Sequence, residues 1–187
     1  PACDDPYAEE QRITENELSS YVLPNGFPVH DNEGGDTYRI KKCLGQGGFG
    51  ISYLAEIDND WAEEGQEVVL KEYVARGFRG QESVRDENYR VSLTFGSLED
   101  VTSESNTFVY LVKFIEEGQV MRAFRKYRGS RIRSASEVFM NSRTNTCYYV
   151  MDYFPKGTLE DELHERGELS EDEAIERIMI PLARALK

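Results

Sequence analysis

Residues 44–54 read LGQGGFGISYL and hold the feature that most limits what this chain can fold into. One aromatic residue, Phe49, stands among four glycines: Gly45, Gly47, Gly48 and Gly50. Glycine costs about 0.5–1 kcal/mol relative to alanine inside a regular element, so such a cluster indicates left-handed backbone or backbone that approaches a ligand closely. Phosphate is the usual ligand of such a loop, because successive main-chain N–H groups can point at it.

The runs on both sides of the glycines have the composition of strands. YRIKKCLG begins at Tyr38, ISYLAEI follows the glycines, and EVVLKEY supplies a third strand over 67–73. The glycines are therefore predicted to form the turn of a hairpin. Regular structure is expected to begin at Tyr38.

Further along the chain the pattern alternates between helix and strand. A helix is predicted over 107–125, strands near 131–139 and 146–152, and a short helix near 158–165. The polar stretch 76–106 is ambiguous, with one alternating piece, 91–95, that suits an inserted strand. A last helix is predicted from Glu171, because Ser170 and Glu173 form a capping box, and Pro181 is expected to bend it.

The glycine spacing suits more than one kind of loop. In a dinucleotide fold it opens a helix, and an acid about twenty residues later holds a ribose. Here a strand follows the glycines, and the residue 21 positions after Gly50 is Lys71, a cation that suits phosphates better than a ribose. A Walker A loop is excluded because no Gly-Lys-Ser/Thr follows. An ordinary hairpin without a ligand remains the alternative.

The predicted helix over 107–125 carries a charge on its apolar face. Tyr110, Phe114, Met121 and Phe124 recur at helical spacing, and Glu117 falls on the same face. A buried carboxylate is costly unless it is paired, so a cation is expected opposite it. Lys71 lies in a core-like strand and also needs a partner. Either side chain could instead extend to solvent, but both together beside the glycine loop favour a pair.

At this point the chain resembles a known family. LGQGGFGISYLAE, VVLKEY, FIEEG and YYVMDYFPKGTL are similar to the N-terminal lobe of a protein kinase of the bacterial eukaryotic-like Ser/Thr type, over about residues 38–187. The resemblance implies an α+β fold: a twisted antiparallel sheet with one packed regulatory helix, then a hinge and the first helices of a truncated C-terminal lobe. It divides the chain into an acidic N-terminal extension (1–37), the ATP-binding lobe (38–154), and the hinge exit with those first helices (155–187).

The resemblance also implies roles for individual residues. Lys71 would hold the α- and β-phosphates of ATP and Glu117 would pair with it, as the two catalytic positions in this chain. Phe49 would close the glycine loop over the phosphates. The implied ATP-binding set is Leu44, Gly45, Gln46, Gly47, Gly48, Phe49, Gly50, Ser52, Val69, Lys71, Met151 (gatekeeper), Asp152 and Phe154 (hinge) and Thr158 (near the ribose).

Several positions depart from the family pattern. Valine is usual where Ser52 stands and alanine where Val69 stands, so the roof of the purine pocket is altered. Gly118 replaces a common alanine, which weakens the helix by up to about 1 kcal/mol. The segment that usually reads like HPNIV is GSRIR, 129–133. None of these departures by itself abolishes nucleotide binding.

The chain holds no H-R-D-x-x-x-x-N loop and no D-F-G aspartate, so it contains neither the catalytic base nor the magnesium ligands of a kinase. The chain alone is expected to be inactive, and magnesium is expected only with the missing C-terminal portion. Two interpretations stay open: the ATP-binding piece of an active Ser/Thr kinase, or a catalytically dead half-kinase that senses nucleotide or binds a protein partner. The glycines with Lys71 and Glu117 favour the first.

Charge and cysteine content restrict the partners and the compartment. The formal charge of −13 argues against nucleic acid and anionic membranes as partners. Residues 1–37 carry nine carboxylates against one arginine and, with their prolines and glycines, are predicted to be weakly ordered, whereas 121–133 has six cations and no acid. Three scattered cysteines and no signal peptide or membrane span predict a cytoplasmic protein without a zinc site. The protein substrate is not indicated.

Overall fold

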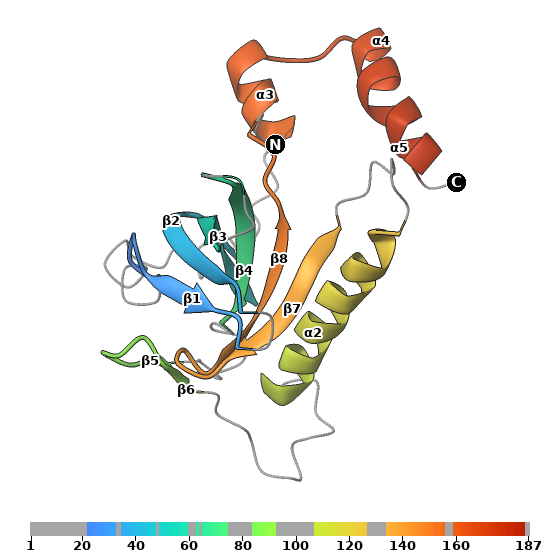
Figure 1. The fold of residues 1–187 in the computed structure, drawn as a ribbon. Helices are drawn as coiled ribbons and strands as arrows, with labels where there is room; N and C mark the ends of the chain where they lie inside the picture. The colour runs from blue at the N-terminus through green and yellow to red at the C-terminus, as the bar shows by residue number, and fades with distance from the viewer. Residues whose placement is uncertain are drawn as a thin grey trace, which may run out of the picture.

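The structure, a computed structural model, describes residues 22–32, 35–47, 49–59, 63, 65–74, 84–92, 107–126, 134–155 and 159–185. Within these residues six strands form one antiparallel sheet in the order β1-β2-β3-β4-β8-β7 (Figure 1). The strands are β1 (Pro28–His30), β2 (Thr37–Gly47), β3 (Gly50–Asp58), β4 (Glu67–Tyr73), β7 (Ala135–Asn141) and β8 (Thr146–Asp152). A separate two-stranded ribbon joins β5 (Val84–Arg85) to β6 (Val91–Ser92).

The helices confirm most of the predicted pattern. Helix α2 (Thr107–Phe124) lies along β7 and β8 on one face of the sheet (Figure 1). After β8 come α3 (Leu159–Arg166), α4 (Glu171–Ala174), a π-helical turn η2 (Ile175–Met179) and α5 (Ile180–Ala185). The predicted capping box is present, since the Ser170 hydroxyl accepts from the Glu173 N–H and the Glu173 carboxylate accepts from the Ser170 N–H. The irregular turn η2 directly precedes α5, which contains Pro181.

Strand β4 separates two apolar cores because successive side chains point to opposite faces of a sheet. Val69 and Tyr73 face α2 and pack with Phe114 and other buried side chains. Val68 and Leu70 face the other way and join the larger core. Lys71 therefore lies on the helix side of the sheet, and its neighbour Glu72 lies on the far side.

Gly118 brings α2 close to the sheet. A Cβ atom at this position would lie 2.8 Å from Cγ2 of Val138 and 3.1 Å from Cδ1 of Tyr149. Real Cβ atoms keep a greater separation, so an alanine would push the helix away from β7 and β8. Glycine at this position is therefore a requirement of helix–sheet packing, and its low helix propensity is the smaller effect.

The prediction that residues 1–37 are weakly ordered is wrong for the part of them that the structure describes from residue 22 onward. Leu23, Phe27 and Val29 are buried in the larger core, and β1 pairs with β2. The sheet thus begins at Pro28, ten residues before the predicted start at Tyr38. Residues 1–21 lie outside the described part of the chain.

The predicted inserted strand over 91–95 is observed at Val91 and Ser92, where it forms the second strand of the β5–β6 ribbon. This ribbon packs on the face of the sheet opposite to α2, where Tyr89 contacts Phe27 with ring centroids 5.0 Å apart. Residues 93–95 lie outside the described residues. The ribbon is the element that sequence reasoning defined least well.

Buried tyrosines make the fold sensitive to alkaline pH. Burial, and secondarily the nearby carboxylates of Glu137 and Glu72, raises the pKa of Tyr38, Tyr53 and Tyr148 well above the usual value. In the unfolded chain these tyrosines ionise near about pH 10. Above that pH the unfolded state binds fewer protons than the folded state, so the free energy of unfolding decreases as pH rises.

Burial also raises the pKa of the Cys147 thiol to about 11, whereas an unfolded thiol ionises near about pH 8.5. We therefore expect the unfolding temperature to fall slightly from about pH 8.5 and steeply above about pH 10. Thermal unfolding followed by circular dichroism, with tyrosinate absorbance recorded in parallel, measures this. The part of the absorbance change that belongs to these three of the eleven tyrosines should appear only as the protein unfolds. Ionisation of all eleven tyrosines in the folded protein would contradict the burial of these hydroxyls.

Candidate functional site

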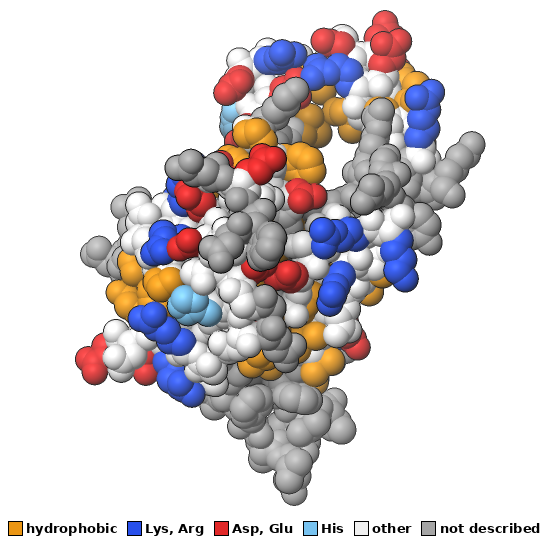
Figure 2. Space-filling view, viewed as in Figure 1, with side chains coloured by type: hydrophobic (Ala, Val, Ile, Leu, Met, Phe, Trp, Pro, Cys, Tyr) orange, Lys and Arg blue, Asp and Glu red, His pale blue; other side chains and the backbone are white. Residues whose placement is uncertain are grey.

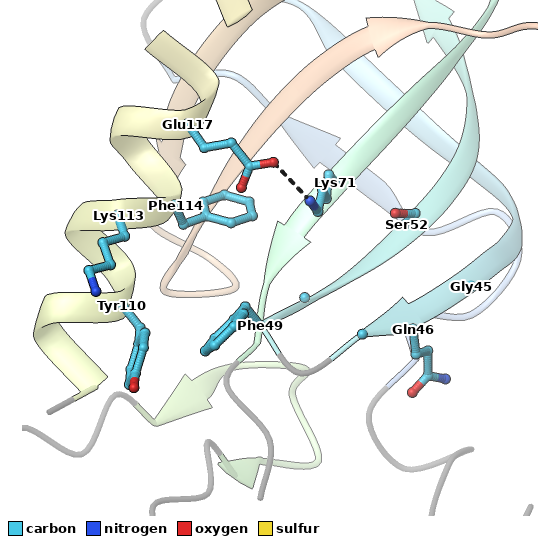
Figure 3. A pocket seen from close by; sticks show the side chains of 11 residues that line it. Gly45, Gln46, Phe49, Ser52, Lys71, Tyr110, Lys113, Phe114 and Glu117 are labelled. Carbon is cyan, nitrogen blue, oxygen red and sulfur yellow. Dashed lines mark hydrogen bonds and ion pairs between the residues drawn. The ribbon is translucent and has the colours of Figure 1, made fainter. Parts of the chain in front are cut away.

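A lysine and a glutamate meet between the sheet and helix α2. The Nζ atom of Lys71 on β4 lies 3.2 Å from Oε1 of Glu117 on α2 (Figure 3). The Tyr149 hydroxyl donates to the same carboxylate oxygen at 2.8 Å, and the ammonium lies 5.3 Å from the centre of the Tyr149 ring. The Glu117 side chain is 50% exposed and that of Lys71 28%, so the expected burial of the carboxylate is wrong although its pairing is correct.

The glycines form the end of the β2–β3 hairpin, as predicted. Gly47 pairs with Gly50, and Gly45 pairs with Ser52, whose other neighbour on β4 is Lys71. Gly50 is required by close packing, because a Cβ atom there would lie 2.4 Å from the Glu72 carbonyl oxygen. Gly45 has open space where its Cβ would project, with nothing within 4 Å. Its backbone is therefore accessible to a ligand.

The aromatic residue at the hairpin end reaches the helix. The ring of Phe49 stacks on Tyr110 in the first half of α2, with centroids 4.8 Å apart and an interplanar angle of 28° (Figure 3). Lys113, one turn further along α2, places its Nζ 5.5 Å from the centre of the Tyr110 ring. The contact closes one end of the space between the hairpin and the helix.

A pocket of about 580 Å³ occupies this space. Its wall is formed on one side by the hairpin and β4 and on the other side by α2 (Figure 3). The lining residues are Gly45, Gln46, Gly47, Phe49, Gly50, Ser52, Lys71, Tyr110, Lys113, Phe114 and Glu117. A pocket of this size lies in the range that holds small ligands and cofactors. Glycine backbone and two lysines make an anion its best chemical match.

No protein-family model and no curated protein matches this chain. Among solved structures, "PpkA-294 apo form" aligns with a TM-score of 0.65 at 21% identity, covering 89% of this chain and 50% of that one. Vaccinia related kinase 3 aligns with a TM-score of 0.46 at 15% identity, covering 92% of this chain and 45% of the other. Both are protein kinases. The fold is that of a protein-kinase N-terminal lobe. The chain spans about half the length of these kinases.

Of the predicted purine-binding residues, Ser52 lines this pocket, and the structure places five others away from it. Val69 and Met151 are buried and pair across β4 and β8 on the helix side of the sheet. Leu44, Asp152 and Phe154 are exposed. None of these five residues lines the pocket, which corresponds to the phosphate end of the predicted site. Gly48 and Thr158 lie outside the described residues.

Sequence reasoning missed two contacts of the site. The Tyr149 hydroxyl holds Glu117, and Lys113 adds a second cation at the pocket. Alternation along β8 could have identified Tyr149, because it falls on the same face as Met151. Within the described residues no group of three or more His, Cys, Asp and Glu side chains could hold a metal ion. No described helix has the length and hydropathy needed to cross a membrane.

Proposed function

We propose that this chain is the ATP-binding N-terminal portion of a Ser/Thr protein kinase, in which the γ-phosphate of ATP passes to protein hydroxyls. The observation that carries the proposal is the Lys71–Glu117 pair, 3.2 Å apart, at the pocket under the glycine hairpin. A lobe that served only as a scaffold has no chemical need for this combination. In protein kinases a lysine on the third strand and a glutamate on the helix form the pair that must be in place for phosphoryl transfer.

The geometry supports a triphosphate as the ligand. The ammonium of Lys71 is oriented by Glu117, and Tyr149 orients Glu117 in turn, so the cation has a fixed position before any ligand binds. The open space over Gly45 allows phosphate oxygens to approach main-chain N–H groups. We assign the adenine ring to Leu44, Val69, Met151 and the hinge at Asp152–Phe154.

The phosphoryl-transfer step needs groups that the 187 residues do not hold. A catalytic base and magnesium ligands come from H-R-D and D-F-G segments, and neither motif occurs in the sequence. We therefore assign nucleotide binding to this chain, and we assign the chemistry, with magnesium, to a kinase that contains both segments. The chain alone should not transfer phosphate.

A second candidate function is a catalytically dead half-kinase that binds a protein partner. It is favoured by apolar side chains on the helices that follow β8 (Figure 2). Those at least 38% exposed are Leu159, Leu163, Ile175, Met179, Ile180 and Leu182. Exposed apolar surface of this kind often marks an interaction site.

Titration of the purified chain with ATP and ADP by calorimetry tests the first candidate. We expect dissociation constants in the high micromolar to millimolar range. The residues assigned to the adenine cover only one face of the purine, so the other face stays in water, and the 187 residues hold no magnesium ligands that would fix an ion at the phosphates. Lys71→Ala should weaken binding about tenfold or more, since a charge-assisted hydrogen bond contributes roughly 1.5–3 kcal/mol.

Lys126→Ala is the matched control, because Lys126 is exposed beyond the end of α2 and does not line the pocket. This variant removes the same charge and should bind like the wild type. Equal weakening by both substitutions would point to a general charge effect. Absence of ATP binding at millimolar concentration would favour the second candidate, the half-kinase that binds a protein partner.

A further inference from the structure

A buried carboxylate lies directly behind the candidate site. Glu72 follows Lys71 on β4 and points to the opposite face of the sheet, where its side chain is 0% exposed. It accepts hydrogen bonds from the Tyr53 hydroxyl at 2.8 Å and the Tyr148 hydroxyl at 2.5 Å. Its third partner is the Arg85 guanidinium at 2.6 Å. The proposed nucleotide-binding role uses none of these groups.

Arg85 comes from the β5–β6 ribbon and is itself 0% exposed in its side chain. Although burial opposes the charged form, the Glu72 carboxylate raises the pKa of Arg85, so the guanidinium keeps its charge. Arg85 also donates to the Tyr89 carbonyl at 2.8 Å. The ribbon has a second attachment, since the Val91 N–H donates to the Thr144 carbonyl at 2.7 Å.

The segment of β4 that this network holds is the one that forms the site on its front face. The Glu72 carbonyl oxygen lies against Gly50, and the Val74 N–H donates to the Phe49 carbonyl at 3.3 Å. Lys71 is the adjacent residue. A displacement of Glu72 would therefore move both the end of the glycine hairpin and the lysine.

We propose that Glu72 and Arg85 are positioning residues, through which the β5–β6 ribbon sets the place of Lys71 and the glycine hairpin. The ligand named here, an adenine nucleotide, rests on the proposed function. The positioning of Lys71 does not, because it concerns the arrangement of the free chain.

A purely structural role makes a different prediction. Exchange of a buried ion pair for uncharged residues of similar volume often leaves stability unchanged or increased. The double variant Glu72→Gln/Arg85→Met removes both charges. The glutamine keeps an acceptor oxygen for one tyrosine hydroxyl and presents its NH2 group to the oxygen of the other. If the pair only stabilises the fold, a folded double variant should retain the geometry of the site. If the pair positions Lys71, the site should change while the fold persists.

The test compares the wild type, the double variant and Val29→Ala, a control that removes buried volume from β1 in the same core. The first readout is the NMR resonance of the Lys71 ε-methylene group at pH 7, referenced to Glu117→Gln, in which the pair is broken. The second readout is the affinity for ADP. We expect the double variant to move the Lys71 resonance toward its position in Glu117→Gln and to lose ADP affinity about tenfold. Val29→Ala should change neither.

The outcomes separate the two proposals. A folded double variant with the wild-type Lys71 resonance and unchanged ADP affinity overturns the positioning role. If the wild type does not bind ADP, the proposed function fails, and the Lys71 resonance alone decides the positioning role. If the double variant does not fold, Tyr148→Phe replaces it, because this substitution removes one hydrogen bond to Glu72 and leaves no unpaired charge; an unchanged resonance there also overturns the proposal.

Discussion

Arg85→Met is expected to lower the free energy of unfolding by about 3–5 kcal/mol, the largest effect of any single substitution considered for this chain. The substitution leaves the Glu72 carboxylate buried without its cation, and the two tyrosine hydroxyls that remain cannot neutralise it. Domains of this size are stable by roughly 5–15 kcal/mol, so the loss is a large fraction of the total. Urea denaturation followed by circular dichroism measures it.

Two further variants make this result specific. Arg90→Met, on the same ribbon, removes an exposed guanidinium that donates to the Ser142 carbonyl, and it should cost less than about 0.5 kcal/mol. Adding Glu72→Gln to Arg85→Met should restore most of the stability, because the uncompensated charge is then gone. A cost below about 1 kcal/mol for Arg85→Met would contradict the buried ion pair.

Gly50→Ala is expected to destabilise the fold by about 1–3 kcal/mol and to abolish nucleotide binding by this chain. The new Cβ would meet the Glu72 carbonyl oxygen at 2.4 Å. Because that oxygen belongs to the backbone, no rotamer change relieves the contact, and β3 has to separate from β4. The separation displaces Phe49 and Lys71 from each other, so the effect reaches the pocket as well as the stability.

Gly45→Ala is the matched control for stability, since nothing lies within 4 Å of its Cβ position. It should leave the unfolding transition close to that of the wild type. Urea denaturation of the two variants, together with ADP titration of Gly50→Ala, checks the prediction. Equal stability of both variants would show that the hairpin end is less tightly packed against β4 than the structure indicates.

The sequence predicted those parts of the site that a short, local sequence pattern defines. The glycine spacing, the strand containing Lys71 and the helical periodicity around Glu117 each have a short repeat that can be read directly. The cost of two unpaired charges on apolar faces favoured a Lys71–Glu117 pair, but the sequence left open whether the two are paired in the resting form, and Glu117 is half-exposed. These arguments needed no knowledge of how distant segments pack.

The rest depended on contacts between distant segments. Glu72 stands at a two-residue spacing among Val68, Leu70 and Val74, so its inward direction could have been read from the sequence, but its partner Arg85 lies in the polar stretch whose pattern was ambiguous. In the sequence, prolines, glycines and carboxylates surround Leu23, Phe27 and Val29, so the composition of this segment did not indicate that these three residues are buried. The sequence indicated only that Gly118 weakens the helix, whereas the short distance between α2 and the sheet is what requires a glycine at this position.

Amide chemical-shift mapping during titration with ADP tests the central claim, nucleotide binding in the pocket between the glycine hairpin and α2, most directly. We predict saturable perturbations at Gly45–Gly50 and Lys71, together with Asp152–Phe154 where the adenine edge would bind, and their loss in Lys71→Ala. Perturbation confined to other surfaces, or none in this set at millimolar ADP, would contradict the account.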